Sequence, residues 1–338
     1  MTANHPRRIR MKDVAERADV SSSTVSFVLA GRSDMRIPDS TRQRVLDAAR
    51  ELNYRPNLMA RGLRTKSSST IGLVSNGIVT EPYASELIRG ALTTAHEHQQ
   101  LLVVIEAQND RATERRLVQD LISRQVDGFI YATLLTGRVN VPRQLTGHPL
   151  VLLNCWSSAR TAAILPDEVQ GGAAAANALL AAGHRHGIFI VGETPAHLLP
   201  AEGRRAGVES ALVQAGAELG GVIACRWWPE SAFDAMTAFL QDHGPPQAVI
   251  CMNDRVTFGV YQALAAAGVV VPDDVSLVSF DDSDLARWLR PQVTSVAMPY
   301  ADMGRRAVEA LLSTQPLKGP ERVLMPLRER ASIARFGS

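Results

Sequence analysis

The sequence predicts a small all-α domain at the N-terminus, followed by a larger α/β core of two lobes, each with a doubly wound parallel sheet. Short apolar helical segments fill the first 66 residues, whereas from residue 71 onward strand-like apolar runs alternate with helical stretches. Such alternation is typical of parallel sheets covered by helices on both faces. Residues 1–66 also contain fourteen Lys or Arg against seven Asp or Glu. The small domain is therefore the part suited to a polyanionic partner.

Residues 11–29 predict two short helices joined by a tight turn. Small apolar residues recur at helical spacing up to Ala18, Asp19 interrupts them, and Ser21 stands where an N-cap would begin a second helix. This is the layout of a helix-turn-helix, whose second helix enters the major groove of DNA. The alternative interpretation is a small helical cap on a larger domain.

The next segments complete the predicted headpiece and its connection to the core. A third helix is expected over residues 38–53, with Pro38 in its first turn. Asn57 could cap a further helix over 58–64, which is too short to be stable alone in water. We therefore predict a headpiece at 1–56, a hinge helix and linker at 57–69, and a core at 70–338.

The core shows the alternation most clearly. The predicted strands are IGLVS, LLVVIEA, DGFIYA, PLVLLN, HGIFIVG, GVIACRW, QAVICMN and DVSLVSFD, and helical stretches separate them. So many units exceed one ordinary doubly wound sheet, which favours two similar lobes that divide near 163–167, with the chain crossing back near 293–300. A cleft between two such lobes is where ligands usually bind.

Composition and spacing argue against several other classes of protein. Cys155, Cys225 and Cys251 lie far apart without C-x-x-C spacing, so we expect buried thiols and no metal site. The histidine pairs HEH at 96–98 and HRH at 184–186 lack the spacing of a zinc site and are expected to be solvated or to lie at helix ends. No G-x-S-x-G or phosphate-binding glycine loop is present, which favours a protein that is not an enzyme and has no cofactor.

The ends and apolar runs of the chain bear on its location. The basic start MTANHPRRIR is not followed by the apolar region of a signal peptide, and no apolar run approaches the length of a membrane span. We therefore expect a cytoplasmic protein with no membrane partner.

Several segments carry the motifs of one known family: KDVAERADVSSSTVSFVLAG, TRQRVLDAARELNYRPNLMARGLRT, PDEVQGG, MNDRVTFG and VSLVSFDDSDLARWLRPQVTSV. They resemble bacterial transcription repressors of the lactose-repressor (LacI/GalR) family. The resemblance implies a core similar to periplasmic sugar-binding proteins and a homodimer that binds paired half-sites of operator DNA. It also implies a repressor whose operator affinity is controlled by a small molecule, expected to be a sugar, bound between the lobes.

Other functions remain open at this point. A solute-binding receptor of the periplasmic type or a sugar-processing enzyme could share the same core. Within the regulators, the effector could be a purine, a phosphorylated metabolite or a protein partner.

The resemblance implies roles for residues of the second helix. It assigns major-groove contacts to Ser22, Ser23 and Phe27, phosphate contacts to Thr24 and Ser26, and the N-cap, with a further phosphate contact, to Ser21. Phe27 stands where many members have arginine, so we expect it to contact a thymine methyl; the alternative is packing against the third helix. Asp19 replaces the usual glycine of the turn, but Asp tolerates left-handed backbone geometry.

The segment after the headpiece resembles the family's hinge helix, which enters the minor groove as a pair. The resemblance assigns DNA or partner-hinge contacts to Asn57, Met59, Arg61 and Leu63. Leu63 would be the wedge that opens a base step and kinks the duplex, and the alternative is that it packs on the core.

The resemblance also implies an effector site facing the cleft. Its residues would be Tyr83, Asp167, Arg204, Asn253, Asp281 and Trp228, with Trp227 an alternative aromatic platform. Carboxylates accept from sugar hydroxyls, guanidinium groups donate to them, and aromatic rings cover apolar sugar faces. The alternatives are helix capping for Asn253 and Asp281, a loop-holding role for Asp167, and core packing for the tryptophans. Glu168 departs from the asparagine of many relatives, which bears on the identity of the ligand.

Overall fold

The computed structural model describes residues 9–29, 36–54, 67–79, 81, 85–158, 160–192 and 199–336. The chain divides into two compact units, residues 1–68 and 69–338. Tyr83, Asn57, Met59, Arg61 and Leu63 lie outside the described residues.

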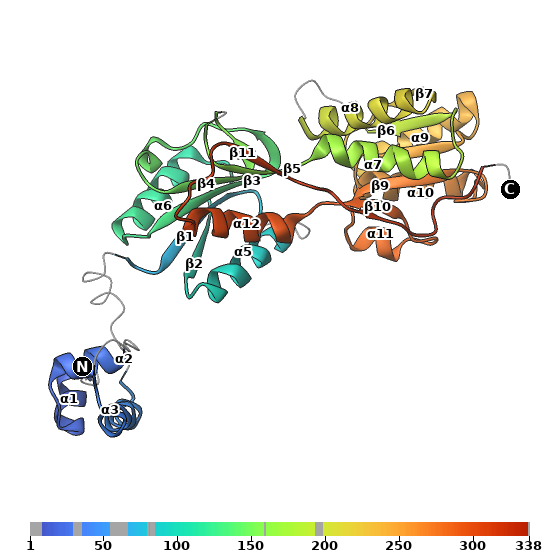
Figure 1. Cartoon of the computed structure of the whole chain (residues 1–338). Helices are drawn as coiled ribbons and strands as arrows, with labels where there is room; N and C mark the ends of the chain where they lie inside the picture. The colour runs from blue at the N-terminus through green and yellow to red at the C-terminus, as the bar shows by residue number, and fades with distance from the viewer. Residues whose placement is uncertain are drawn as a thin grey trace, which may run out of the picture. The chain divides into compact units, whose positions relative to one another are not determined.

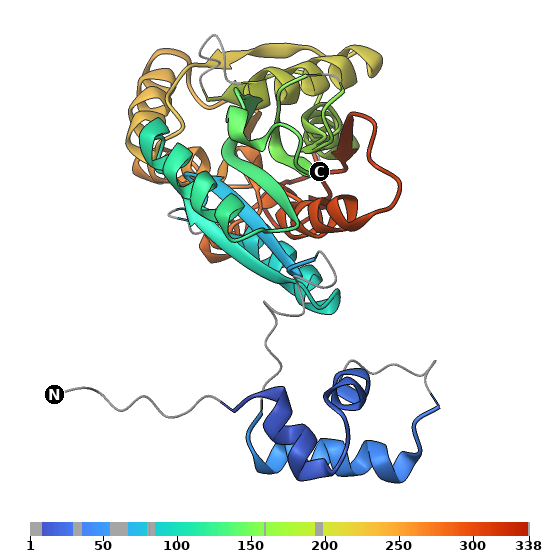
Figure 2. The same cartoon turned by 90° about the vertical axis from the view of Figure 1, so that its left-hand side faces the viewer.

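In the described part of the first unit, three helices pack around a small core (Figures 1 and 2): α1 (Met11–Ala18), α2 (Ser22–Leu29) and α3 (Asp39–Glu51). Asp19 ends α1 with a left-handed backbone at φ 51°, which confirms that aspartate is accommodated in the turn. The three helices bury small apolar side chains against one another: Val14, Ala15, Ala18, Val25, Val28, Val45, Ala48 and Ala49. Because these residues are small, the short helices can pack closely around this core of eight buried side chains from the described residues.

The second unit contains two six-stranded sheets. In the N-terminal lobe the strand order is β11 (Pro320–Val323), β5 (Ala163–Pro166), β4 (Leu150–Trp156), β3 (Gly128–Arg138), β1 (Thr70–Asn76) and β2 (Leu101–Glu106). In the C-terminal lobe it is β12 (Leu327–Arg328), β10 (Thr294–Ala297), β9 (Ser276–Asp281), β8 (Ala248–Cys251), β6 (Ile188–Val191) and β7 (Leu219–Ile223). Adjacent strands are parallel except for the β10–β12 pair.

Helices cover both faces of each sheet, as Figure 1 shows. The N-terminal lobe has α5 (Ser85–Glu97) and α12 (Tyr300–Leu312) on one core, α6 (Arg111–Ser123) on the other, and the short 3-10 helix η2 (Arg143–Leu145). The C-terminal lobe has α7 (Glu168–Ala181) and α8 (Leu199–Gln214) on one core, α9 (Pro229–His243) and α10 (Asp254–Ala266) on the other, and α11 (Asp284–Trp288). The predicted doubly wound, two-lobed fold is confirmed.

The chain passes between the two lobes after β5, after β10 and after β11. The third passage runs through residues 324–326. The predicted strand at 221–227 ends at Ile223. Beyond it, the backbone N–H of Arg226 donates to Ser231 Oγ and that of Trp228 to the Arg226 carbonyl, so the chain turns away from the sheet.

The three cysteines and His184 are all buried in the core. All three cysteines are buried thiols, as expected. Gly183, at φ +98°, follows the C-cap Ala182 of α7, and the backbone N–H of His184 donates to the Leu179 carbonyl at 3.1 Å, so the helix end expected here is confirmed. The side chain of His184 is buried, not solvated. His184 is 4% exposed, and its Nε2 lies 2.9 Å from Ser276 Oγ and 3.2 Å from the Ala334 carbonyl oxygen. Residues near the C-terminus cover it, which local sequence could not indicate.

Candidate functional site

The N-terminus of α2 is surrounded by hydroxyl groups. The backbone N–H of Thr24 donates to Ser21 Oγ at 3.1 Å, which confirms Ser21 as the N-cap. Ser21 Oγ also lies 2.7 Å from Ser23 Oγ and 2.9 Å from Thr24 Oγ1. The first N–H groups of a helix and its dipole favour an anion, so this end of α2 is suited to a phosphate.

The two faces of α2 have different environments. Val25 and Val28 are buried in the headpiece core, whereas Ser22 and Ser23 are exposed. Phe27 is half-buried and lies outside the set of residues that forms that core. The helix thus buries one side in the headpiece and presents short polar side chains on the other.

A cavity of about 510 Å³ lies between the two lobes of the core. The N-terminal lobe contributes Glu81, Leu134, Leu135, Thr136, Asn154 and Tyr300, and the C-terminal lobe contributes Glu168, Pro200, Arg204, Arg226, Trp227, Trp228, Asn253, Arg255, Asp281 and Met298. Most of these residues follow the carboxyl ends of parallel strands, where α/β folds usually bind ligands.

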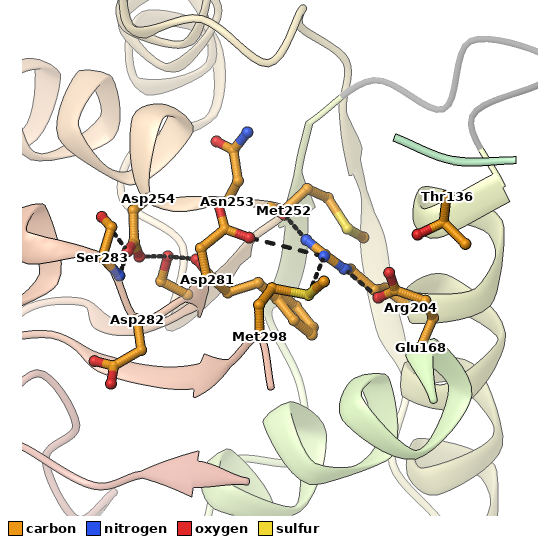
Figure 3. Close-up of polar contacts among 12 residues, drawn as sticks. Thr136, Glu168, Arg204, Met252, Asn253, Asp254, Asp281, Asp282, Ser283 and Met298 are labelled. Carbon is orange, nitrogen blue, oxygen red and sulfur yellow. Dashed lines mark hydrogen bonds and ion pairs between the residues drawn. The ribbon is translucent and has the colours of Figure 1, made fainter. Parts of the chain in front are cut away.

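Arg204 is the central polar group of the cavity and is only 3% exposed. Its Nε donates to Glu168 Oε2 at 2.7 Å, and its Nη2 lies 3.8 Å from Asp281 Oδ1 (Figure 3). Nη1 donates to the Met252 carbonyl, and the guanidinium carbon lies 4.5 Å from the Phe280 ring centroid. Burial would lower the pKa of Arg204, but the nearby carboxylates outweigh it and raise that pKa. The guanidinium is therefore charged and fixed in orientation.

A further carboxyl group, that of Asp254, lies next to this cluster of charges. Asp254 accepts from Ser279 Oγ at 2.6 Å and from both the backbone N–H and Oγ of Ser283 at 2.7 Å. Burial, and then the charge of Asp281, raises the pKa of Asp254 to about 7. Burial also raises the pKa of Asp281, against the effect of Arg204. The inner wall of the cavity therefore holds more carboxyl groups than cations.

Asn154 shapes the opposite wall. It is 1% exposed, its Nδ2 donates to the carbonyls of Thr133 and Leu134 at 3.0 and 2.8 Å, and its Oδ1 accepts from Thr136 Oγ1 at 2.6 Å. These bonds hold β3 where its register with β4 shifts, between residues 132 and 137. The irregular strand places Leu135, 52% exposed, at the cavity.

One ion pair spans the cleft at its rim. Arg255 Nη2 at the start of α10 donates to Glu81 Oε2, from the segment after β1, at 2.8 Å. The guanidinium carbon of Arg255 also lies 4.5 Å from the Trp228 ring centroid. The two lobes are thus joined by a side-chain contact beside the cavity.

The structure brings together four of the six predicted effector residues: Arg204, Asn253, Asp281 and Trp228. Asn253 also caps α10, since its Oδ1 accepts from the Val256 N–H at 2.8 Å. Asp167 instead caps α7 through the Gln170 N–H at 3.1 Å and does not line the cavity, whereas its neighbour Glu168 does. The sequence signalled Glu168 only as a departure from the family.

Sequence reasoning missed Asn154, Glu81 and Arg255 as cavity residues. Asn154 carried one usable signal, since a polar residue at the end of a buried strand faces the ligand edge of a parallel sheet. Glu81 and Arg255 lie far apart in the chain, and no local pattern links them.

Among the described residues, no group of three or more His, Cys, Asp or Glu is placed to hold a metal ion. Within the same ranges, no helix is both long and apolar enough to cross a membrane.

Comparisons with known proteins agree with both parts of this architecture. Residues 10–57 match the family described as bacterial regulatory proteins, lacI family, and residues 176–333 match the periplasmic binding protein-like domain. The chain is 33% identical over 320 residues to the ribose operon repressor of Haemophilus influenzae, covering 92% of each chain.

Solved structures extend the comparison to the fold. A lac repressor dimer bound to operator and the anti-inducer ONPF gives a TM-score of 0.80 at 25% identity, covering 97% of this chain and all 100% of that one. A LacI family transcriptional regulator from Enterococcus faecium with bound ribose gives a TM-score of 0.62 at 25% identity, covering 79% of this chain and 99% of that one.

The chain belongs to the lacI family of bacterial regulatory proteins. It is a transcription regulator with a helix-turn-helix headpiece and a two-lobed core of the ligand-binding kind. The function expected from the sequence is confirmed at this level.

Proposed function

We propose that this protein is a homodimeric repressor whose affinity for operator DNA is set by a sugar bound in the cavity between its lobes. The observation that carries the proposal is the buried Arg204, fixed between Glu168 and Asp281 in a cavity that tryptophan side chains also line. Guanidinium, carboxylate and amide groups match the donors and acceptors of sugar hydroxyls, and indole rings match the apolar sugar faces. The ribose named in two relatives supports this class of effector.

In this proposal α2 reads the operator. Ser22, Ser23 and Phe27 contact base edges in the major groove, and Ser21, Thr24 and Ser26 contact or adjoin phosphates. The exposed hydroxyls and the capped helix N-terminus support these roles. Because DNA is the partner, we place the protein in the cytoplasm.

The hinge segment connects the two sites. Asn57, Met59, Arg61 and Leu63 of each subunit pair in the minor groove, where Leu63 wedges into a base step. An effector that binds one arrangement of the lobes more tightly changes the spacing of the two hinges. By linkage, the effector and the operator then change each other's affinity by the same factor.

Two binding measurements on the full-length protein test the proposal. Duplexes selected from a random pool should converge on a palindromic site, and fluorescence anisotropy should show that one sugar of a panel changes affinity for that site by roughly 5- to 150-fold. Leu63→Ala should weaken operator binding but leave sugar binding intact. A selected pool without a shared motif, or an operator affinity that no sugar alters, would contradict the proposal.

A further inference from the structure

Two buried polar atoms in the cavity have no hydrogen-bond partner within the described part of the chain. Glu168 is 5% exposed, and its Oε2 accepts a hydrogen bond from Arg204 Nε, but its Oε1 is unpaired. The Nε1–H of Trp227 is the second such atom. Buried donors and acceptors are almost always paired in proteins, so an unpaired acceptor and an unpaired donor lining one cavity point to a ligand that pairs with both.

The charges of the cavity are unevenly distributed. At the inner wall, the carboxylates of Glu168 and Asp281 share the single guanidinium of Arg204. At the rim, Arg255 is paired with Glu81, and Arg226 is exposed. Water screens an exposed cation strongly, whereas buried charges interact through a lower dielectric. The excess of carboxylate at the inner wall therefore decides which charge a ligand can carry there.

Given the sugar effector proposed above, on which this step rests, we propose that Glu168 and Trp227 select an uncharged polyol. One of its hydroxyls donates to Glu168 Oε1, and one of its oxygens accepts from Trp227 Nε1. A hydroxyl can do both, whereas a phosphate or carboxylate at neutral pH offers mainly acceptor oxygens. Such an anion leaves Glu168 Oε1 unpaired and adds negative charge beside two carboxylates. The anionic group of a phosphorylated or carboxylated sugar is thus excluded from the inner wall.

Matched pairs of ligands test the selection on the unaltered protein. Isothermal titration calorimetry with D-ribose and D-ribose 5-phosphate, D-glucose and D-glucose 6-phosphate, and D-galactose and D-galacturonate should find a pair whose neutral member binds at least about tenfold tighter. An anionic member that binds as tightly as its neutral partner overturns the selection but leaves the sugar effector standing. If no compound of a wider panel of charged and uncharged sugars binds, the proposed effector class and this selection both fail.

Substitutions at Glu168 and Trp227 test whether these two residues cause the preference for neutral sugars. Glu168→Gln keeps the size of the side chain but removes its charge, and its amide can turn a donor toward the ligand. We expect affinity for the neutral sugar to fall about tenfold or more, with a smaller gap between the members of the pair. Trp227→Phe removes the Nε1–H but keeps an aromatic ring. This variant should also lower the affinity for the neutral sugar.

Glu209→Gln is the matched control, because Glu209 lies on the same helix as Arg204 but pairs with Arg205 outside the cavity. It should change neither affinity. If the Glu168→Gln variant lost the same amount of affinity for neutral and for anionic sugars, Glu168 would only hold Arg204 in place. That result would overturn the proposal. Should Glu168→Gln fail to fold, the ligand pairs on the unaltered protein still decide the selection.

Discussion

Under the proposed function, Phe27 is the side chain of α2 that we expect to bear most directly on the operator sequence. It is half-buried on the helix and cannot make the bidentate pair with guanine that an arginine makes, but it can contact a thymine methyl. Phe27→Arg should therefore shift the preferred base at one operator position toward guanine, by about 1–3 kcal/mol of discrimination. Sequencing of duplexes selected by each protein measures the shift. An unchanged preference would place Phe27 among the packing residues of the headpiece.

Asp254 should make the stability of the core depend on pH. Burial, and then the charge of Asp281, raises the pKa of Asp254 from 3.8 to about 7 in the folded state. The folded protein then binds this proton more tightly than the unfolded chain. The resulting stabilisation is complete below about pH 4 and is lost as pH rises through 7.

The variant Asp254→Asn resembles the protonated state at every pH. Between pH 5 and pH 8, the free energy of unfolding of the unaltered protein should fall relative to that of the variant by on the order of 2–4 kcal/mol. Urea unfolding of both proteins at the two pH values measures the difference. Parallel pH dependence in the two proteins would show that Asp254 does not titrate in this range.

At the scale of elements, the contact between α7 and α8 positions the ion pair of the cavity. A Cβ atom on Gly172 would lie 1.9 Å from the carbonyl oxygen of Arg204, and one on Gly207 would lie 2.0 Å from that of Val169. The two helices can approach this closely only because both residues lack a side chain. Arg204 on α8 thereby reaches Glu168 at the start of α7.

Gly172→Ala should disturb both stability and binding. The added methyl forces α7 and α8 apart, which we expect to cost about 1–3 kcal/mol of the free energy of unfolding and to weaken effector binding. Denaturant unfolding and calorimetry measure the two effects. Gly137→Ala is the control, since the nearest atom to its Cβ would be 3.8 Å away. Weaker folding with unchanged sugar affinity would separate the helix contact from the site.

The N-terminal lobe also has a close contact between two helices at glycine residues. A Cβ on Gly90 of α5 would lie 2.0 Å from the carbonyl oxygen of Ala301, and one on Gly304 of α12 would lie 2.1 Å from that of Leu87. Each lobe therefore packs one pair of helices through glycines on both partners. Because such close packing restricts movement of these helices within a lobe, we expect a change between states to occur at the passages between the lobes.

For the whole molecule, the contact between Glu81 and Arg255 couples the two lobes. The bond measures 2.8 Å, and the two side chains are 23% and 24% exposed, so water screens it only in part. A double-mutant cycle with Glu81→Gln and Arg255→Gln, read out as effector affinity, should give a coupling energy of about 0.5–3 kcal/mol. Strictly additive effects of the two substitutions would show that the ion pair does not contribute to holding the lobes together around the ligand.

The sequence predicted the fold well because its strands and helices can be recognised from local patterns of apolar residues. Buried parallel strands such as β8 (Ala248–Cys251) are continuous apolar runs, and the helices between them have apolar faces. Arg204 and Asp281 were predicted as site residues through the family resemblance, and both line the cavity. Phosphate and base contacts of α2 remain predictions.

The rest depended on contacts between distant parts of the chain. His184 is buried beneath Ala334 and Phe336, and Asp167 turns to cap α7 while its neighbour Glu168 reaches Arg204. Neither outcome follows from spacing, because one position along a helix start changes the direction of a side chain by about 100°.

The sequence by itself determined the class of this protein: a basic helix-turn-helix headpiece followed by two doubly wound lobes of a regulator. Only the tertiary structure decided the character of the effector cavity. It placed two carboxylates on one buried guanidinium, left one carboxylate oxygen and one indole N–H unpaired, and joined the lobes through Glu81 and Arg255. The reason is physical: helices and strands follow from periodicity within a segment, whereas charge balance and hydrogen-bond pairing depend on side chains that meet only when the chain has folded.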